Sequence, residues 1–457
     1  MPEVAYQALC KPALKAWLSL CIYNRNALDQ HPPVLSKSQR ADLRRQLLEE
    51  AWRYTATLAE IAPLANISAS CEGTSPAFED KEFVVLTGHQ PVIYHPGVLE
   101  KCMQLENFLV ENRAVGLNVI LDLDFGDAGL FLYPRRLSKG QGVEVVSTRI
   151  GGGESLFCLQ CTDSAASISA AFSQAVAGLE SCGLSAAAKR VTQVGRVYLM
   201  FAGKPLLQAH TMVRRHLMMG PRHMEILLSQ ILKLRGVQLF LASFFVEFER
   251  FYFTYNHSLD NFRKAHHIKN PANPFPSLRM VEGRYEMPFW LVDLRSGCRR
   301  PLFLSRQGAG IVFYTDVSEI ARVPRSSLED YASHLPEHLV ICPRAVVLSL
   351  LFRLCLSDLF VHGRGGERYD RFSDLFVEEF FGIRPPDFAV VSATRYLFPL
   401  EASRLNELEA AAALRREFYF HTAQHLSHPC FSPEVRLGLE RLCVIKELAV
   451  SEIRGNK

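Results

Sequence analysis

The spacing of apolar residues changes twice between residues 83 and 124. The apolar run from Phe83 to Leu86 is typical of a buried strand, and Gly88 and Pro91 are residues that favour a turn. After Gly97, apolar residues recur at spacings of four, three and four, which predicts a helix with one buried face. The run from Leu117 to Leu121 has strand character again. The pattern therefore predicts a βαβ unit.

A second βαβ unit is predicted between residues 342 and 394. We expect a helix with Pro343 at its first position, and its buried part runs from Ala345 to Leu356. A short strand from Leu359 to Val361 follows. A glycine-rich turn follows and leads into a helix with a phenylalanine-lined face. The run from Asp387 to Ser392 is the second strand of this unit.

The two units predict an α/β fold with a parallel sheet core and an inserted α+β segment. Within the insert we expect a strand from Val194 to Phe201, a helix from Val237 to Asn256 and an antiparallel meander between residues 284 and 315. Apolar spacing near the end of the chain predicts a helical hairpin whose last helix begins at Ser432. The expected segments are 1–75 (helical), 76–150 (first half of the core), 151–340 (insert), 341–400 (second half of the core) and 401–457 (C-terminal hairpin).

Charge and cysteine content narrow the class of protein. With 51 Lys and Arg against 47 Asp and Glu, the net charge of +4 is too balanced for a nucleic-acid platform or a membrane-surface protein. The N-terminus lacks the pattern of a secretory signal, and the apolar stretch 345–360 is interrupted by Arg353 and Asp358. The 12 cysteines lie mostly in apolar runs, as reduced core thiols do. We expect a cytoplasmic protein that acts on a small molecule.

Polar residues cluster where the first strand ends. In a βαβ unit the ligand crevice lies beyond the carboxyl ends of the strands, which nominates the turn after Leu86 and the acidic end of the next strand. Imidazole and carboxylate side chains there suit general acid and base chemistry. The candidate catalytic residues are His89, Asp122 and Asp124, and the candidate binding residues are Thr87, Gly88, Gln90, His95 and Lys101.

The glycine-rich turn after Val361 is the second candidate. Three glycines between a strand and a helix N-terminus let backbone amides approach an anion such as a phosphate or a carboxylate. The spacing fits neither a Walker P-loop nor the dinucleotide fingerprint. His362 is the candidate catalytic residue here, with binding assigned to Gly363, Arg364, Gly365, Gly366, Glu367, Tyr369 and Asp370. If both strands lie near the middle of one sheet, the two turns form one site.

At these two stretches the chain resembles the bacillithiol biosynthesis cysteine-adding enzyme family (BshC). The family has a Thr-Gly-Gln-Gln turn after its first core strand, where this chain has Thr-Gly-His-Gln from Thr87 to Gln90. It also has a late Gly-Gly-Pro-Gly-Glu-x-x-Tyr-type turn, which falls on the segment from Gly363 to Tyr369. The resemblance implies a Rossmann-like core, a C-terminal coiled coil that forms a homodimer, and ligation of cysteine to an aminosugar malate conjugate.

The departures from the family pattern lie where substrate would be contacted. His89 replaces a glutamine, Pro91 interrupts the small residues that follow, and His362 and Arg364 enter the second turn. The acidic strand end lacks the family's histidine. The acceptor can therefore differ from that of the family.

Three functions follow from these patterns. The first is a ligase that joins cysteine or a similar amino acid to an amine acceptor, with ATP as one candidate activator of the carboxylate. The second is a nucleotidyltransferase-like enzyme of the same fold, and the third is a non-catalytic binding protein. No metal site is expected, because a surface role suits His421, His425 and His428 better than metal ligation. Of six arginines in the meander, one or two are expected to bind an anionic substrate: Arg279, Arg284, Arg295, Arg299, Arg300 and Arg306.

Overall fold

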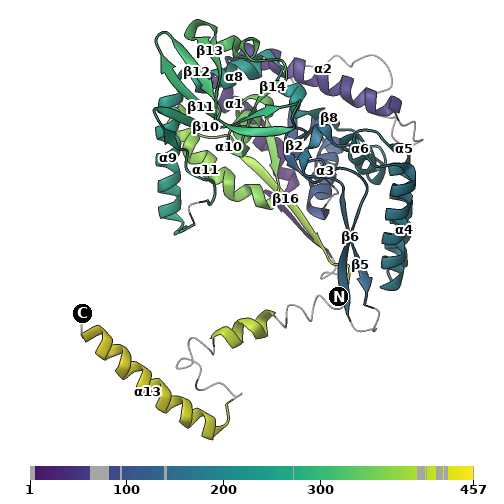
Figure 1. Cartoon of the computed structure of the whole chain (residues 1–457), viewed down its shortest axis with the longest axis vertical. Coiled ribbons are helices and arrows are strands. Elements are labelled where there is room, and N and C mark those ends of the chain that lie inside the picture. The colour runs from purple at the N-terminus through teal and green to yellow at the C-terminus, as the bar shows by residue number, and fades with distance from the viewer. Residues whose placement is uncertain are drawn as a thin grey trace. The chain divides into compact units, whose positions relative to one another are not determined.

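The computed structural model describes residues 6–61, 82–92, 95–137, 142–270, 272–398, 407, 409–417, 426 and 431–455. The chain divides into two units, one of residues 8–393 and one of residues 1–7 with 394–457. The larger unit contains the two main sheets and the helices around them (Figure 1).

A six-stranded, mostly parallel sheet forms the centre of the larger unit. Its strands, in spatial order, are β1 (Tyr6–Lys11), β16 (Phe388–Arg395), β15 (Leu359–His362), β2 (Phe83–His89), β3 (Ala114–Ile120) and β8 (Met224–Leu227). Each neighbouring pair from β16 to β8 is parallel. The central strands are continuous apolar runs because helices cover both of their faces. The structure thus confirms a mixed α/β fold with a parallel core.

The helices on the two faces of this sheet can be assigned from the core clusters. Val85 and Val361 point to the face covered by α1 (Trp17–Gln30) and α3 (Pro96–Glu111). Val84 and Leu86 belong to the larger core on the other face. That face is covered by α2 (Lys37–Ile61), α10 (Ala345–Leu351) and α11 (Arg364–Phe381).

A second sheet confirms the predicted antiparallel meander. Its order is β13 (Glu319–Pro324), β12 (Gly310–Tyr314), β11 (Cys298–Gln307), β10 (Arg284–Asp293) and β14 (Leu339–Pro343), with β9 (Met280–Val281) paired to β10. The pairs along this order are antiparallel. The sheet packs on α8 (Arg235–Val246) through edge-on contacts of Phe245 with Phe289 and Phe313. The aromatic residues of α8, Phe240, Phe244 and Phe245, are all buried.

The rest of the insert is a helical layer with a hairpin. The hairpin strands β5 (Leu130–Arg136) and β6 (Val143–Arg149) lie beside α4 (Ala165–Ser181), as Figure 1 shows. Next come α5 (Ser185–Met200) and α6 (Leu206–Leu217). The shorter elements are β4 (Phe125–Gly126), β7 (Ser155–Leu156) and α7 (Leu228–Ile231).

Several predicted elements are wrong. The segment from Val194 to Phe201 is not a strand but the end of α5, since its apolar residues pack at helical spacing on α6. The expected single helix from Val237 to Asn256 is two, because Glu247 separates α8 from α9 (Phe248–Ala265). Pro343 ends β14, so that α10 begins two residues later than expected. The chain then continues as a π-helical turn, Phe352–Leu356.

The second unit contains the last helix, α13 (Pro433–Gly455). The Val435 amide donates to the Ser432 hydroxyl at 3.3 Å, which confirms the predicted N-cap. Residues 409–417 are helical as well. His421, His425 and His428 lie outside the described residues, and so does part of the predicted hairpin. Across the described parts of the chain, no helix combines the length and apolar character that a bilayer crossing requires.

Candidate functional site

The two predicted turns lie at the same edge of the central sheet. β2 and β15 are neighbours, with Thr87 opposite Val361, and the Thr87 hydroxyl donates to the Val361 carbonyl at 3.0 Å. Because the strands are parallel, the ends at His89 and His362 point the same way. The strand order also reverses here, since β3 and β8 lie on one side of β2 while β15 and β16 lie on the other. Open α/β sheets bind ligands at such a reversal.

His89 is a partly buried, neutral imidazole. Its Nδ1 lies 3.0 Å from the Gln90 carbonyl oxygen, so an Nδ1–H donates there and leaves Nε2 as an acceptor. Burial, followed by the nearby charge of Lys101, lowers the pKa of His89 to about 4. At neutral pH the ring therefore carries no charge.

Lys101 is a buried amine beneath the same turn. Its Nζ donates to the Gly88 carbonyl at 2.7 Å, which satisfies a backbone group at the end of β2. Burial lowers the pKa of Lys101 to about 8. The sequence placed Lys101 beside the first turn, and the structure agrees. His95 has a structural role, because its exposed ring caps α3 by accepting a hydrogen bond from the Gly97 amide at 3.1 Å.

The two candidate carboxylates have different surroundings. Asp122 is buried, and its Oδ1 accepts from the Ser229 amide at 3.0 Å at the start of α7. Burial raises the pKa of Asp122. Asp124 is partly exposed and accepts from the Gln90 side chain and from Arg299 of the meander. Asp124 therefore connects the first turn to the second sheet, whereas Asp122 supports the fold beside it.

His362 lies in a cluster with two residues of other elements. Its Nε2 is 2.8 Å from Oδ2 of the buried Asp370 on α11 and 3.3 Å from the Ser349 hydroxyl on α10. Burial raises the pKa of Asp370, but the charges of His362 and Arg353 outweigh that effect, so that the net shift is downward. Arg353 Nη1 lies 3.7 Å from the same carboxylate. Asp370 is thus a buried carboxylate, held ionised, in close contact with the imidazole.

The glycine-rich segment is a helix start and not a free turn. α11 begins at Arg364, with Gly363 as its N-cap and no side chain capping it. The amides of Gly366 and Glu367 donate to the Gly363 carbonyl at 3.0 and 3.2 Å. A Cβ at Gly366 would overlap the His362 ring, whereas one at Gly365 would meet nothing within 4 Å. Gly366 is therefore what lets the helix approach His362.

The other predicted residues of this segment have partners of their own. Glu367 pairs with Arg371 at 3.6 Å on the same helix, and the Tyr369 ring lies 5.0 Å from that of Phe275. Arg364 and Gly365 are exposed at the helix start. The structure therefore brings His362 and Asp370 together, but it does not bring Glu367 or Tyr369 into contact with either histidine.

Two residues of the site were not singled out by the sequence analysis. Ser349 and Arg353 lie in the apolar run that was predicted to form a buried helix. Arg299 was one of six meander arginines, and only the structure shows that it reaches Asp124, over the face of Trp290 at 4.9 Å from the ring centroid. Arg344 lies over the same ring at 3.9 Å.

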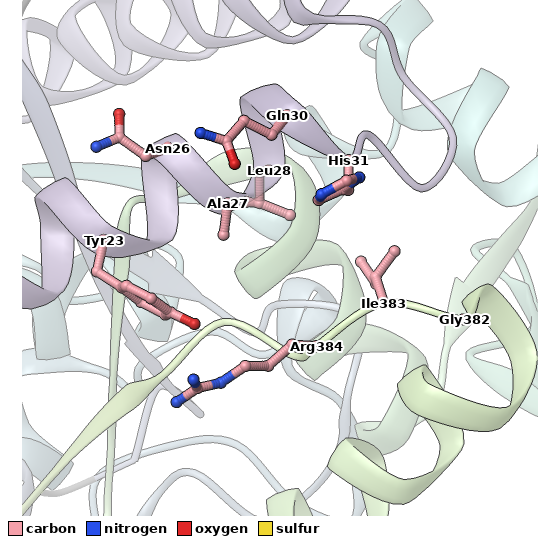
Figure 2. Close-up of a pocket in the computed structure, with 9 residues that line it drawn as sticks. All are labelled: Tyr23, Asn26, Ala27, Leu28, Gln30, His31, Gly382, Ile383 and Arg384. Atoms are coloured by element: carbon pink, nitrogen blue, oxygen red, sulfur yellow. The ribbon is translucent and has the colours of Figure 1, made fainter.

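A separate pocket of about 560 Å³ lies elsewhere in the same unit. Figure 2 shows two of its lining residues close together, Tyr23 of α1 and Arg384 from the segment that precedes β16, with the Arg384 guanidinium carbon 4.9 Å from the centroid of the Tyr23 ring. Residues 382–384 come before the start of β16, so this pocket lies at the amino edge of the sheet. It contains none of the residues predicted from the sequence.

Within the described part of the chain, no group of three or more His, Cys, Asp or Glu side chains is arranged to hold a metal ion. Searches against protein-family models and curated proteins return no match to this chain.

Proposed function

We propose that the chain is a ligase-type enzyme that joins an amino acid, cysteine or a similar one, to an amine acceptor such as an aminosugar conjugate. The observation that carries this proposal is the adjacency of β2 and β15, whose carboxyl ends bear His89 and His362 at the point where the strand order reverses. Amide formation needs a base, polar residues that bind the substrates and a site that binds the anionic leaving group. All three have candidate residues at this edge.

The proposal includes a Rossmann-like core. Numbered in chain order, the parallel strands β8, β3, β2, β15 and β16 are arranged 3-2-1-4-5, as in the doubly wound dinucleotide-binding sheet. Helices on both faces support the same interpretation. β1 is then an added edge strand.

His362 is the base in this proposal. The acceptor amine gives up a proton to the imidazole as its nitrogen attacks the carbonyl carbon of the activated amino acid. Asp370 holds the ring at 2.8 Å and stabilises the imidazolium that forms. His89, neutral and partly buried, offers Nε2 as a hydrogen-bond acceptor to the same acceptor molecule.

The carboxylate that is attacked must first be activated, because a free carboxylate does not expel its oxygen. Transfer of a phosphoryl or adenylyl group from ATP would supply a leaving group. The uncapped start of α11, the exposed Arg364 and the buried charge of Lys101 favour an anion at this edge. Phosphate or AMP then leaves as the C–N bond forms.

The test is incubation of the purified protein with ATP, cysteine and a panel of aminosugars, with mass spectrometry of the products. We expect a conjugate heavier than the aminosugar by one cysteinyl group with the wild type, and its loss in His362→Ala. The matched control is Arg325→Gln, an exposed arginine directly after β13. Absence of any conjugate, AMP or ADP with every pair of substrates contradicts the ligase proposal.

The open helix start also favours a second candidate, a nucleotidyltransferase-like enzyme in which His89 and His362 contact an α-phosphate. Exchange of labelled pyrophosphate into ATP without conjugate formation would support this alternative over the ligase.

A further inference from the structure

A second anion-binding surface lies on the helical layer, in a cleft of about 580 Å³ between α5 and the end of α6. Arg190, Gln193, Val197 and Met200 follow the spacing 3, 4, 3 and share one face of α5, with Arg196 beside them. His216, Leu217 and Met219 close the cleft from α6. None of these residues belongs to the candidate site at the sheet edge.

The charged side chains that line this cleft are all basic. No acidic residue is among those that line it. Neither Arg190 nor Arg196 has an ion pair or hydrogen bond to a side chain within the described ranges. By contrast, other exposed arginines do face a carboxylate, for example Arg45, Arg135, Arg250 and Arg322. Two unpaired guanidinium groups and an imidazole at one cleft favour an anion with several acceptor oxygens.

The helix end does not oppose an anion here. The last carbonyls of α6 would repel it if they were free, but those of Arg214, Arg215 and His216 each accept from a backbone amide. The amides of Met218, Met219 and Gly220 donate to the carbonyls of Arg214, His216 and Arg215 at 3.1, 3.1 and 3.2 Å.

The same cleft exposes apolar side chains, and one of them belongs to a residue with a strained backbone. Met219 is 81% exposed and has φ of 57°, in the left-handed region that favours glycine. Met200 and Leu217 are 41% and 44% exposed beside it. Strain at an exposed residue points to a role outside the fold, because the fold itself would be better served by glycine.

We infer that this cleft binds an anionic amphiphile, with a phosphate or carboxylate on Arg190 and Arg196 and an apolar chain along Met200, Leu217 and Met219. The same chemistry occurs in a free acyl or alkyl anion and in the head group of a membrane lipid. The experiment must therefore separate these sources.

The probe is octyl phosphate below its micelle concentration, measured by isothermal titration calorimetry on the full chain. We expect saturable binding that Arg190→Gln with Arg196→Gln weakens about tenfold or more, as loss of two charge-assisted contacts should. The control, Arg45→Gln with Arg325→Gln, removes two other exposed arginines and should leave binding unchanged. Inorganic phosphate and octanol should each bind more weakly than octyl phosphate.

Met219→Gly distinguishes a binding role from a structural one. Glycine relieves the backbone strain, so the midpoint of thermal unfolding should stay the same or rise while affinity for octyl phosphate falls. Octyl phosphate binding that is unaffected by all three cleft substitutions would overturn the inference. Sedimentation with vesicles that contain phosphatidylglycerol, in the absence of binding to the monomeric probe, would overturn it in favour of a membrane surface.

Discussion

Thr87 and Val361 lie opposite each other on neighbouring parallel strands, and the Thr87 hydroxyl donates to the Val361 carbonyl at 3.0 Å. This bond lies one residue before Gly88 and His362, so it fixes the register of the two strand ends that carry the candidate site. Both residues are fully buried, which keeps water from replacing the bond.

We predict that Thr87→Val lowers the free energy of unfolding by about 1–2 kcal/mol, because it removes a buried donor without changing the volume of the side chain. Urea titration followed by circular dichroism measures this change. Thr87→Ser keeps the hydroxyl and should retain more of the stability. Equal losses in the two variants would show that packing of the methyl group matters and the hydrogen bond does not.

The two glycines at the start of α11 should respond in opposite directions to alanine. Gly366→Ala places a Cβ against the His362 ring, so we expect a loss of about 1–3 kcal/mol from overpacking, together with loss of conjugate formation. Gly365→Ala meets no neighbour and should stabilise the helix by up to about 1 kcal/mol. Thermal unfolding and the conjugate assay on both variants provide the comparison. Normal activity in Gly366→Ala would remove His362 from the proposed mechanism.

The buried Lys101 should make the free energy of unfolding increase with pH. Its folded-state pKa of about 8 is below the value of about 10.4 expected in the unfolded chain. Between these values the unfolded state binds more protons, so the free energy of unfolding rises with pH by up to about 3 kcal/mol for this residue. Other buried groups titrate in this range, so the quantity to measure is the difference between the wild type and Lys101→Met in urea unfolding from pH 7.5 to about 10. A difference that is flat across this range contradicts the buried charge.

Substitution of Asp122 and of Asp124 should have different effects on stability and on activity. Asp122→Asn keeps an oxygen for the Ser229 amide and removes a buried charge, so its stability should stay within about 1 kcal/mol of the wild type, with activity retained. Asp124→Asn breaks the ion pair with Arg299 and should reduce conjugate formation about tenfold through misplacement of the first turn. Kinetic constants for both variants, with cysteine as the varied substrate, decide between these roles. A larger loss of activity in Asp122→Asn than in Asp124→Asn would instead assign the base function to Asp122.

Four strands of the parallel core, β2, β3, β15 and β16, could be predicted from the sequence because each is an apolar run near turn residues, whereas β8 was not predicted. Phe83–His89 and Leu359–His362 are both of this kind, and the structure contains both. β1 was missed, since Tyr6–Lys11 is largely exposed and lacks such a run. The error at Val194–Phe201 has the opposite cause, because β-branched residues near the end of α5 suggested a strand while their packing on α6 determines a helix.

The site was harder to predict than the fold. His362 and Asp370 are close in sequence, so their cluster was visible, although not the direction of the ring. The contact of Asp124 with Arg299 joins positions 175 residues apart, and no local pattern encodes it. The roles of Ser349 and Arg353 depend on how α10 and the following π-helical turn pack beside β15, which becomes evident only in three dimensions.

The position of β2 has a consequence for synthesis of the chain on the ribosome. One of its two neighbours, β15, follows 274 residues later. At translation rates of about 5–20 residues per second, β2 is made on the order of tens of seconds before that partner. During this interval its apolar edge is open to other nascent chains, and truncated products that end before residue 359 should aggregate or require a chaperone.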